Sequence, residues 1–122
     1  MNHRKFDLEE RLIDFSVEVV KFYEFLKPKK PSVHLGGQLI RSSTSPSLNY
    51  GEANAAESKR DFIHKMKVCL KELRETYNCL RIINGAELHD NSNKMKTLLI
   101  ENNELISIFV TSINTAKRKK DS

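Results

Sequence analysis

The sequence predicts an all-α fold, an antiparallel up-down four-helix bundle. Apolar residues recur at alternating four- and three-residue spacing along four long segments, which is the pattern of helices that bury one face. No segment shows the strict polar–apolar alternation of a half-buried strand. The 122 residues include only four Gly and three Pro, so the loops are expected to be short and consecutive helices to be antiparallel.

The first helix is predicted over residues 7–26. Its apolar stripe consists of Leu8, Leu12, Phe15, Val19, Phe22 and Leu26. The prolines of the following KPKKPS segment lack a backbone N–H and end the helix. Val17 and Phe25 interrupt the polar face of this helix, which makes them candidates for contact with another subunit. The alternative is that they are isolated exposed apolar residues, which need no partner.

The second helix is predicted over residues 33–56, with Ser32 as its N-cap. Half of its core face is small, which permits close approach of the backbones; the face consists of Leu39, Ile40, Ser43, Ser47, Tyr50 and Ala53. Pro46 predicts a kink or break in this helix, where nearby hydroxyl groups can satisfy freed backbone groups. Asn49 and Glu52 are candidates for a buried polar network that fixes the register of the bundle, or alternatively for a ligand site.

The third helix is predicted to begin after the N-cap Ser58 and to end at Asn84-Gly85. Its core stripe is expected to be Phe62, Met66, Cys69, Leu73, Thr76, Leu80 and Ile83. Ten residues of helix separate Cys69 from Cys79 by about 15 Å, too far for a disulfide, so both thiols are expected to be reduced. The LKELRE segment is expected to be a solvated face on which Lys71 pairs with Glu75.

The fourth helix is predicted to begin near Ser92 and to reach a basic tail. Its expected core positions are Met95, Leu99, Asn102, Ile106, Phe109, Ile113 and Ala116. The bundle is therefore assigned to residues 1–116 and the tail to residues 117–122. Four consecutive cations account for most of the net charge of +5: Lys117, Arg118, Lys119 and Lys120.

No catalytic, cofactor-binding or metal-binding pattern is found, so enzymatic activity is not expected. The phosphate-binding glycine loops, the nucleophile elbow and the HExxH motif are absent from the sequence. His64 has no nucleophile or second base near it and is interpreted as a surface histidine. The N-terminus lacks an apolar signal segment and residues 105–116 are too few to span a bilayer, so a cytoplasmic location is expected.

Five stretches, in order, resemble the 23S ribosomal RNA intervening-sequence proteins, a family of small bacterial four-helix bundles. They are DFSVEVVKFYEFL, QLIRSSTS, NYGEA, SKRDFIHKM and LKELRET, and the resemblance covers about residues 6–117. It implies a ring-shaped homopentamer and brings no enzymatic activity. A related branch is the accessory protein of diversity-generating retroelements, which binds nucleic acid and a reverse transcriptase.

The leading hypothesis is an oligomer that associates with RNA or a nucleoprotein through the basic tail. If the tail is instead a solvated end, the next candidates for phosphate contact are Arg41, Arg74 and Arg81. The tail lacks aromatic residues between its cations, so any binding is expected to be weakly sequence-specific. The second hypothesis is a protein-interaction scaffold without nucleic acid. Attachment to a membrane ranks last, because no aromatic anchor accompanies the lysines.

Overall fold

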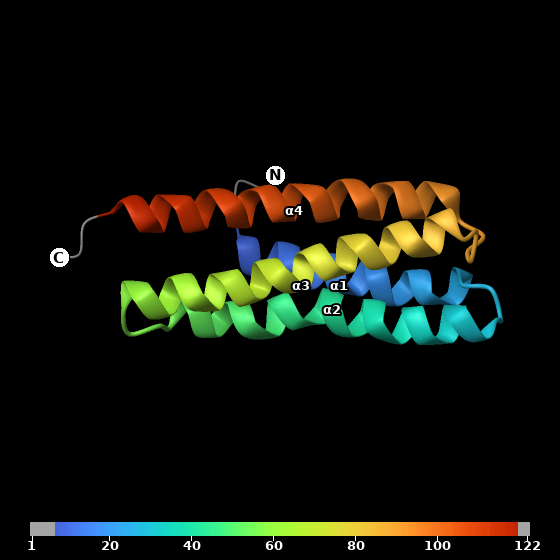
Figure 1. Cartoon of the computed structure of the whole chain (residues 1–122), viewed down its shortest axis with the longest axis horizontal. Helices are drawn as coiled ribbons and strands as arrows, with labels where there is room; N and C mark the ends of the chain where they lie inside the picture. The colour runs from blue at the N-terminus through green and yellow to red at the C-terminus, as the bar shows by residue number, and fades with distance from the viewer. Residues whose placement is uncertain (1–6, 120–122) are drawn as a thin grey trace.

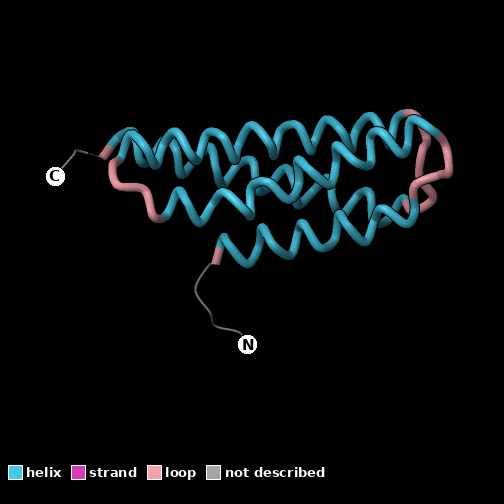
Figure 2. Tube along the Cα trace, turned by 90° about the horizontal axis from the view of Figure 1, so that it is seen from below, coloured by secondary structure: helices cyan, strands magenta, loops and turns pink. Residues whose placement is uncertain are grey.

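Four helices pack side by side in an antiparallel up-down bundle, as predicted (Figure 1). The structure, a computed structural model, describes residues 7–119. Each helix packs on its neighbour in the chain, and α1 also packs on α4, so α1 and α3 lie diagonally across the bundle. Two of the loops lie at one end of the bundle and the third lies at the other end (Figure 2).

Helix α1 spans Leu8–Phe22 and continues as a short 3-10 helix, η1, over Tyr23–Phe25. The Asp7 side chain caps α1 by accepting a hydrogen bond from the Glu10 N–H at 3.1 Å. Because a 3-10 helix has three residues per turn, Phe25 eclipses Phe22 and turns toward the core. Phe25 is half-buried, with its ring centroid 6.4 Å from that of Phe22, so its predicted place on the polar face is wrong.

Helix α2 spans Lys30–Asn54 and begins earlier than predicted. Proline fits the first turn of a helix, where its missing N–H is not needed, and Pro31 occupies that position. The residue that precedes the helix is therefore Lys29, and the assignment of Ser32 as N-cap is wrong. The Ser32 hydroxyl is instead buried and has no hydrogen-bond partner among the described residues.

Helix α2 does not break at Pro46, which is buried in the middle of a continuous helix. The hydroxyl groups of the preceding residues donate to carbonyls of the same helix, for example Thr44 Oγ1 to the Ile40 carbonyl at 2.8 Å. Packing against α1 and α3 along its length outweighs the single backbone bond that the proline removes.

Helix α3 spans Lys59–Gly85 and is capped by Ser58, as predicted. Helix α4 spans Ser92–Arg118, so Lys117 and Arg118 belong to its last turn rather than to a separate tail. Cations in the last turn of a helix are stabilised by the partial negative charge of its C-terminus.

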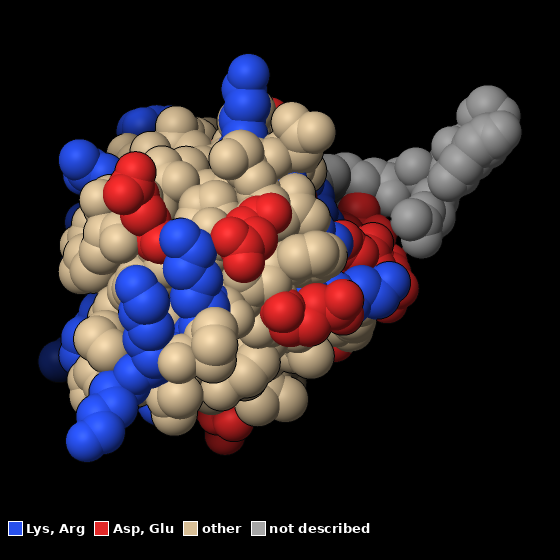
Figure 3. All heavy atoms as spheres, turned by 90° about the vertical axis from the view of Figure 1, so that its right-hand side faces the viewer, with Lys and Arg blue, Asp and Glu red and all other residues tan. Residues whose placement is uncertain are grey.

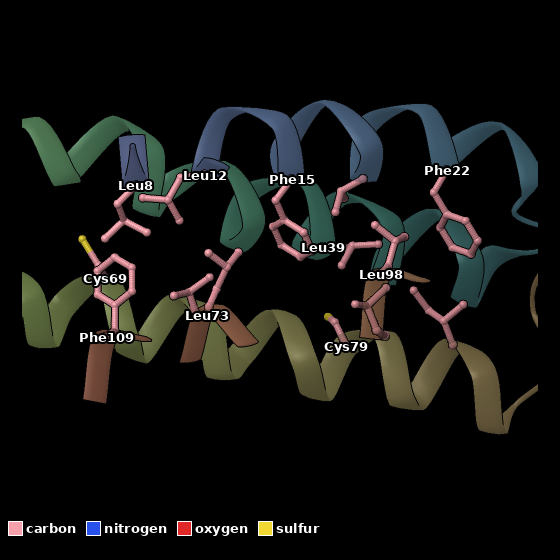
Figure 4. Packing of buried hydrophobic residues seen from close by; sticks show 14 of the residues in the cluster. Leu8, Leu12, Phe15, Phe22, Leu39, Cys69, Leu73, Cys79, Leu98 and Phe109 are labelled. Carbon is pink, nitrogen blue, oxygen red and sulfur yellow. The ribbon is translucent and has the colours of Figure 1, made fainter. Parts of the chain in front are cut away.

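The core runs along the axis of the bundle and takes apolar side chains from all four helices (Figure 4). In α4 the fully buried positions include Leu98 and Leu105, while the predicted Leu99 and Ile106 are half-buried. Two neighbouring apolar stripes exist on α4, and the one between α1 and α3 is the buried one.

Hydrogen bonds within the core join the helices at small polar residues. Thr76 Oγ1 donates to Ser42 Oγ at 2.8 Å, and Ser16 Oγ donates to the Ser43 carbonyl at 3.0 Å. The proposed buried network of Asn49 and Glu52 does not form. Glu52 lies on an exposed position of α2, with 65% of its side chain accessible, and the amide of Asn49 bonds only Ser45 of its own helix.

Candidate nucleic-acid interface

A row of cations runs along the exposed face of α3. Seven positions at four- and three-residue spacing are all solvent-exposed, and none of them is acidic. They are Arg60, His64, Lys67, Lys71, Arg74, Asn78 and Arg81. We call these seven positions the α3 row. No ion pair among residues 7–119 involves any of its five cations. Their charges are therefore available to an external anion.

The acidic residues of α3 all lie on the side that faces α2. Glu72 and Glu75 both bond Arg41 of α2, the former at 3.2 Å. Asp61 lies 3.5 Å from Lys65, which also reaches toward α2. Because these carboxylates are held away from the α3 row, they do not neutralise it.

The pairing of Arg41 changes two expectations. The hydrogen bond from Arg41 to Glu75, together with Glu72, raises the pKa of the guanidinium and occupies the side chain. Arg41 is therefore a weaker candidate for phosphate contact than the unpaired cations of the α3 row. The expected ion pair between Lys71 and Glu75 is absent, because Glu75 bonds Arg41 and leaves Lys71 in the exposed row.

Helix α4 extends the basic surface beside α3. Both of its glutamates turn toward α1, where Arg11 bonds Glu101 at 2.6 Å and Glu104 at 2.7 Å. The bond to Glu101 is the main cause that raises the pKa of Arg11. The helical period places the exposed Lys96 and Lys117 on the opposite side of α4, toward α3.

The C-terminal cations adjoin the start of the α3 row. The ammonium group of Lys59 donates a hydrogen bond to the backbone carbonyl of Lys119, which brings the end of α4 next to Arg60. The structure thus joins Lys117, Arg118 and Lys119 to the α3 row in one surface. Lys120, the last cation of the predicted tail, lies outside the described residues.

Three cations of the α3 row, Arg60, Lys67 and Lys71, were not identified from the sequence. The signal was present, since they share the spacing of Arg74 and Arg81, which were identified singly. That spacing is the same one that identifies a buried apolar stripe, applied to charges. The spacing of the cations identifies a basic face only when the ion pairs of the nearby acidic residues are also known.

The opposite side of the bundle is acidic. Between residues 7 and 24 the chain has six acidic and two basic side chains. Figure 3, which looks along the bundle, shows acidic side chains crowded on the right and basic side chains mainly on the left. A groove of about 570 Å³ between α1 and α4 is lined by the carboxylates of Asp14, Glu18 and Glu101. The Lys94 ammonium in this groove bonds Glu18 and lowers the pKa of that carboxyl, so the groove does not suit an anion.

Three apolar residues on α1 are exposed at helical spacing next to these acidic side chains. Ile13 is 40% exposed, Val17 is 42% exposed and Val20 is 49% exposed. The structure therefore confirms that Val17 is exposed and places it in a short apolar stripe, which we call the α1 stripe. Phe25 does not belong to it.

The remaining reactive groups are buried or isolated. Burial raises the pKa of the Cys69 thiol to about 11 and raises that of Cys79, which disfavours the reactive thiolate in both. Among residues 7–119 no three or more His, Cys, Asp and Glu side chains gather in a group that could hold a metal ion. Nor does any helix in this part of the chain have the length and apolar character needed to cross a membrane.

Comparison with known proteins agrees with this architecture. Residues 4–110 match the protein family described as 23S rRNA-intervening sequence protein. A solved structure from Bacteroides thetaiotaomicron, a protein of unknown function from the S23 ribosomal protein family, is 27% identical with a TM-score of 0.79. The match covers 88% of this chain and 98% of that one. No curated protein matches the chain. Because the family match spans most of its length, the chain belongs to the 23S rRNA-intervening sequence protein family.

Proposed function

We propose that this protein is a non-enzymatic, oligomeric four-helix bundle that binds RNA through the α3 row and the adjoining C-terminal cations. The observation that carries the proposal is the row of five exposed cations without an ion pair among the described residues, on a helix whose acidic residues are all turned away. The name of the family, which refers to 23S rRNA, supports RNA as the polyanion.

Phosphate neutralisation supplies the binding energy of such a surface. Each Lys or Arg that contacts a phosphate releases a condensed counterion, so the affinity falls linearly with salt on a logarithmic scale. Contacts of this kind carry no sequence information directly. We therefore expect binding to RNA of mixed sequence, with strong salt dependence and weak sequence preference.

A matched pair of double variants tests this proposal. Arg74→Gln with Arg81→Gln removes two cations from the α3 row, whereas Lys21→Gln with Lys30→Gln removes two exposed cations elsewhere. Fluorescence anisotropy with labelled mixed-sequence RNA should show weaker binding and a shallower salt slope for the first variant only. Equal loss in both variants would show that net charge rather than this face controls binding. Absence of binding by the intact protein at low salt would favour a protein-interaction scaffold instead.

We further propose that the protein assembles as a homopentamer and that the α1 stripe lies in the subunit interface. Apolar side chains at Ile13, Val17 and Val20 are exposed on α1, diagonally across the bundle from α3. Assembly through this stripe leaves the α3 row of every subunit open to RNA, and five copies multiply the charge that one RNA meets.

Light scattering tests the assembly. The intact protein should have a mass near five times 14.1 kDa at micromolar concentration. Val17→Asp, which places a charge within the stripe, should shift the mass toward the monomer, while Val33→Asp on α2, also exposed, serves as the control. A mass near 14.1 kDa for the intact protein would contradict the proposed assembly.

A further inference from the structure

The α3 row lies on one continuous helix and is fixed in length. Helix α3 is continuous from Lys59 to Gly85, so Arg60 and Arg81 lie about 32 Å apart along its axis. Four of the five cations follow a seven-residue repeat, which spaces them at steps of about 10.5 Å. The row therefore presents charges along one line and cannot bend to follow a flexible ligand.

No Phe, Tyr or Trp ring is exposed on this surface. Among the Phe, Tyr and Trp residues of the chain between 7 and 119, Tyr23 is the one that is exposed, and it lies beside Gly36 of α2, away from α3. The aromatic residues of α3, Phe62 and Tyr77, are both half-buried. Proteins that bind single-stranded nucleic acid combine a basic groove with rings on which the bases stack. The α3 row has the charge, and the imidazole of His64 is its one ring.

A rigid row of cations favours a ligand that is itself rigid. A single strand must lose conformational freedom to lie along a helix, and with little stacking only its phosphate contacts offset this loss. A duplex is already straight over this distance and places phosphates of two strands along it. The face thus matches the backbone of a duplex better than that of a single strand.

Two positions within the row carry hydrogen-bonding side chains that are neither Lys nor Arg. His64 and Asn78 are exposed, they lie between the cations, and 14 residues of helix separate them by about 21 Å. Both side chains form hydrogen bonds with hydroxyl groups, and the wide minor groove of an RNA duplex displays its 2′-hydroxyls. We propose that α3 binds an RNA duplex across its minor groove, with the five cations on phosphates and with His64 and Asn78 on 2′-hydroxyls. This inference rests on the proposed function and names the class of RNA.

Three labelled nucleic acids of one sequence test it on the intact protein: an RNA duplex of about 20 base pairs, the corresponding DNA duplex and one RNA strand. At equal salt, anisotropy should show the RNA duplex binding about tenfold more tightly than the single strand. His64→Ala with Asn78→Ala should weaken binding to the RNA duplex severalfold and leave binding to the DNA duplex within about twofold. Gln38→Ala, at an exposed position of α2, is the control and should change neither.

The outcomes separate this inference from the proposed function. Single-stranded RNA that binds as tightly as the duplex would overturn the duplex assignment and leave RNA binding intact. Equal loss on both duplexes in the His64 and Asn78 variant, or no loss on either, would overturn the assignment of 2′-hydroxyl contacts. Failure of all three nucleic acids to bind at low salt would overturn the proposed function itself. Circular dichroism of each variant shows whether its helices are intact.

Discussion

Asn102 has the one fully buried amide side chain among residues 7–119. It is fully buried on α4, and its Nδ2 donates to the Leu73 carbonyl of α3 at 3.0 Å. Its Oδ1 has no partner among the described residues. A buried amide with one bonded and one unbonded end contributes little net stability, because the unsatisfied oxygen offsets the bond that the nitrogen makes. The hydrogen bond from Asn102 to Leu73 instead fixes the alignment of α4 with α3.

Substitutions at Asn102 separate the effect of polarity from that of shape. Asn102→Leu keeps most of the volume and should change the free energy of unfolding by less than about 1 kcal/mol. Asn102→Asp places a carboxylate in the core without a cation to pair with, and it should lower that free energy by about 3 kcal/mol or more at neutral pH. Urea denaturation followed by circular dichroism measures both. A large loss in Asn102→Leu would mean that the single hydrogen bond dominates.

His89 makes the loop between α3 and α4 sensitive to pH. Its Nδ1 accepts a hydrogen bond from the Asn91 N–H at 3.1 Å, and its ring lies 5.5 Å from that of Phe22. Protonation of Nδ1 would break this bond. Partial burial and nearby Lys27 lower the pKa of His89, an effect that Asp90 opposes. The neutral ring is therefore the form that the fold favours.

The consequence is a loss of stability in acid. Above the ordinary histidine pKa of about 6.5 the ring is neutral in both states, whereas below it the unfolded chain takes up the proton first. The free energy of unfolding should thus fall as the pH decreases from about 7 to about 5. His89→Gln should reduce this slope, which urea titrations at several pH values measure. The pKa of Glu18 is lowered, so its effect on stability falls at a more acidic pH and does not overlap that of His89. If the free energy of unfolding of His89→Gln depended on pH as steeply as that of the intact protein, another group would be responsible for the loss of stability in acid.

At the scale of helices, spacing predicted the buried faces where a helix has one apolar stripe. The stripe from Leu8 to Phe22 on α1 is buried as expected. Prediction from spacing failed at Phe25, where the backbone departs from 100° per residue. It also failed on α4, which has two neighbouring apolar stripes. Choosing between Leu98 and Leu99 requires knowing which neighbours flank the helix, and this is a property of the assembled bundle.

Two adjacent glycines of α2 show how closely the segment after α1 packs on α2. A Cβ on Gly36 would lie 2.7 Å from Cε2 of Tyr23 and 2.8 Å from Cδ1 of Leu26. A Cβ on Gly37 would have no atom of a packed neighbour within 4 Å. The two positions thus share a helix and differ in the space around them.

Alanine substitution should therefore have opposite effects at the two positions. Gly37→Ala gains the helix propensity of alanine and should raise the free energy of unfolding by up to about 1 kcal/mol. Gly36→Ala gains the same propensity but forces Tyr23 and Leu26 to move, with a net loss of about 1 kcal/mol expected. Thermal unfolding of the pair measures the difference. Equal stabilisation in both would show that the side chains move aside at little cost.

The candidate interface was predictable only in part, because ion pairs between helices decide which cations stay unpaired. Arg74 and Arg81 are exposed and have no ion pair among the described residues, in keeping with their selection as candidates, whereas Arg41 is held by two glutamates of the next helix. Nothing in the local sequence of Arg41 reveals this contact, because its partners lie 31 and 34 residues away. Pairing across helices, rather than the identity of a residue, decides which cations remain available.

At the scale of the whole molecule, the charges divide the bundle into two sides. The acidic residues of α1 and the α1 stripe share one side, and the α3 row with the end of α4 occupies the other. This division permits contact with another subunit and contact with RNA at once, since neither covers the other. It also explains why a net charge of +5 understates the basic character of one face.

The C-terminal cations should supply part of the RNA affinity and the α3 row the rest. Deletion of residues 117–122 removes four cations and one acidic side chain while it leaves the buried positions of α4 through Ile113 in place. Helicity and oligomeric state should persist, because Lys117 and Arg118 form only the last helical turn. RNA binding should weaken without disappearing, and the salt slope should fall by roughly 0.7 to 0.9 for each phosphate that the shortened protein no longer neutralises. Anisotropy over a salt series measures both quantities. Complete loss of binding would place the site in the C-terminal segment alone, and an unchanged slope would place it on α3 alone.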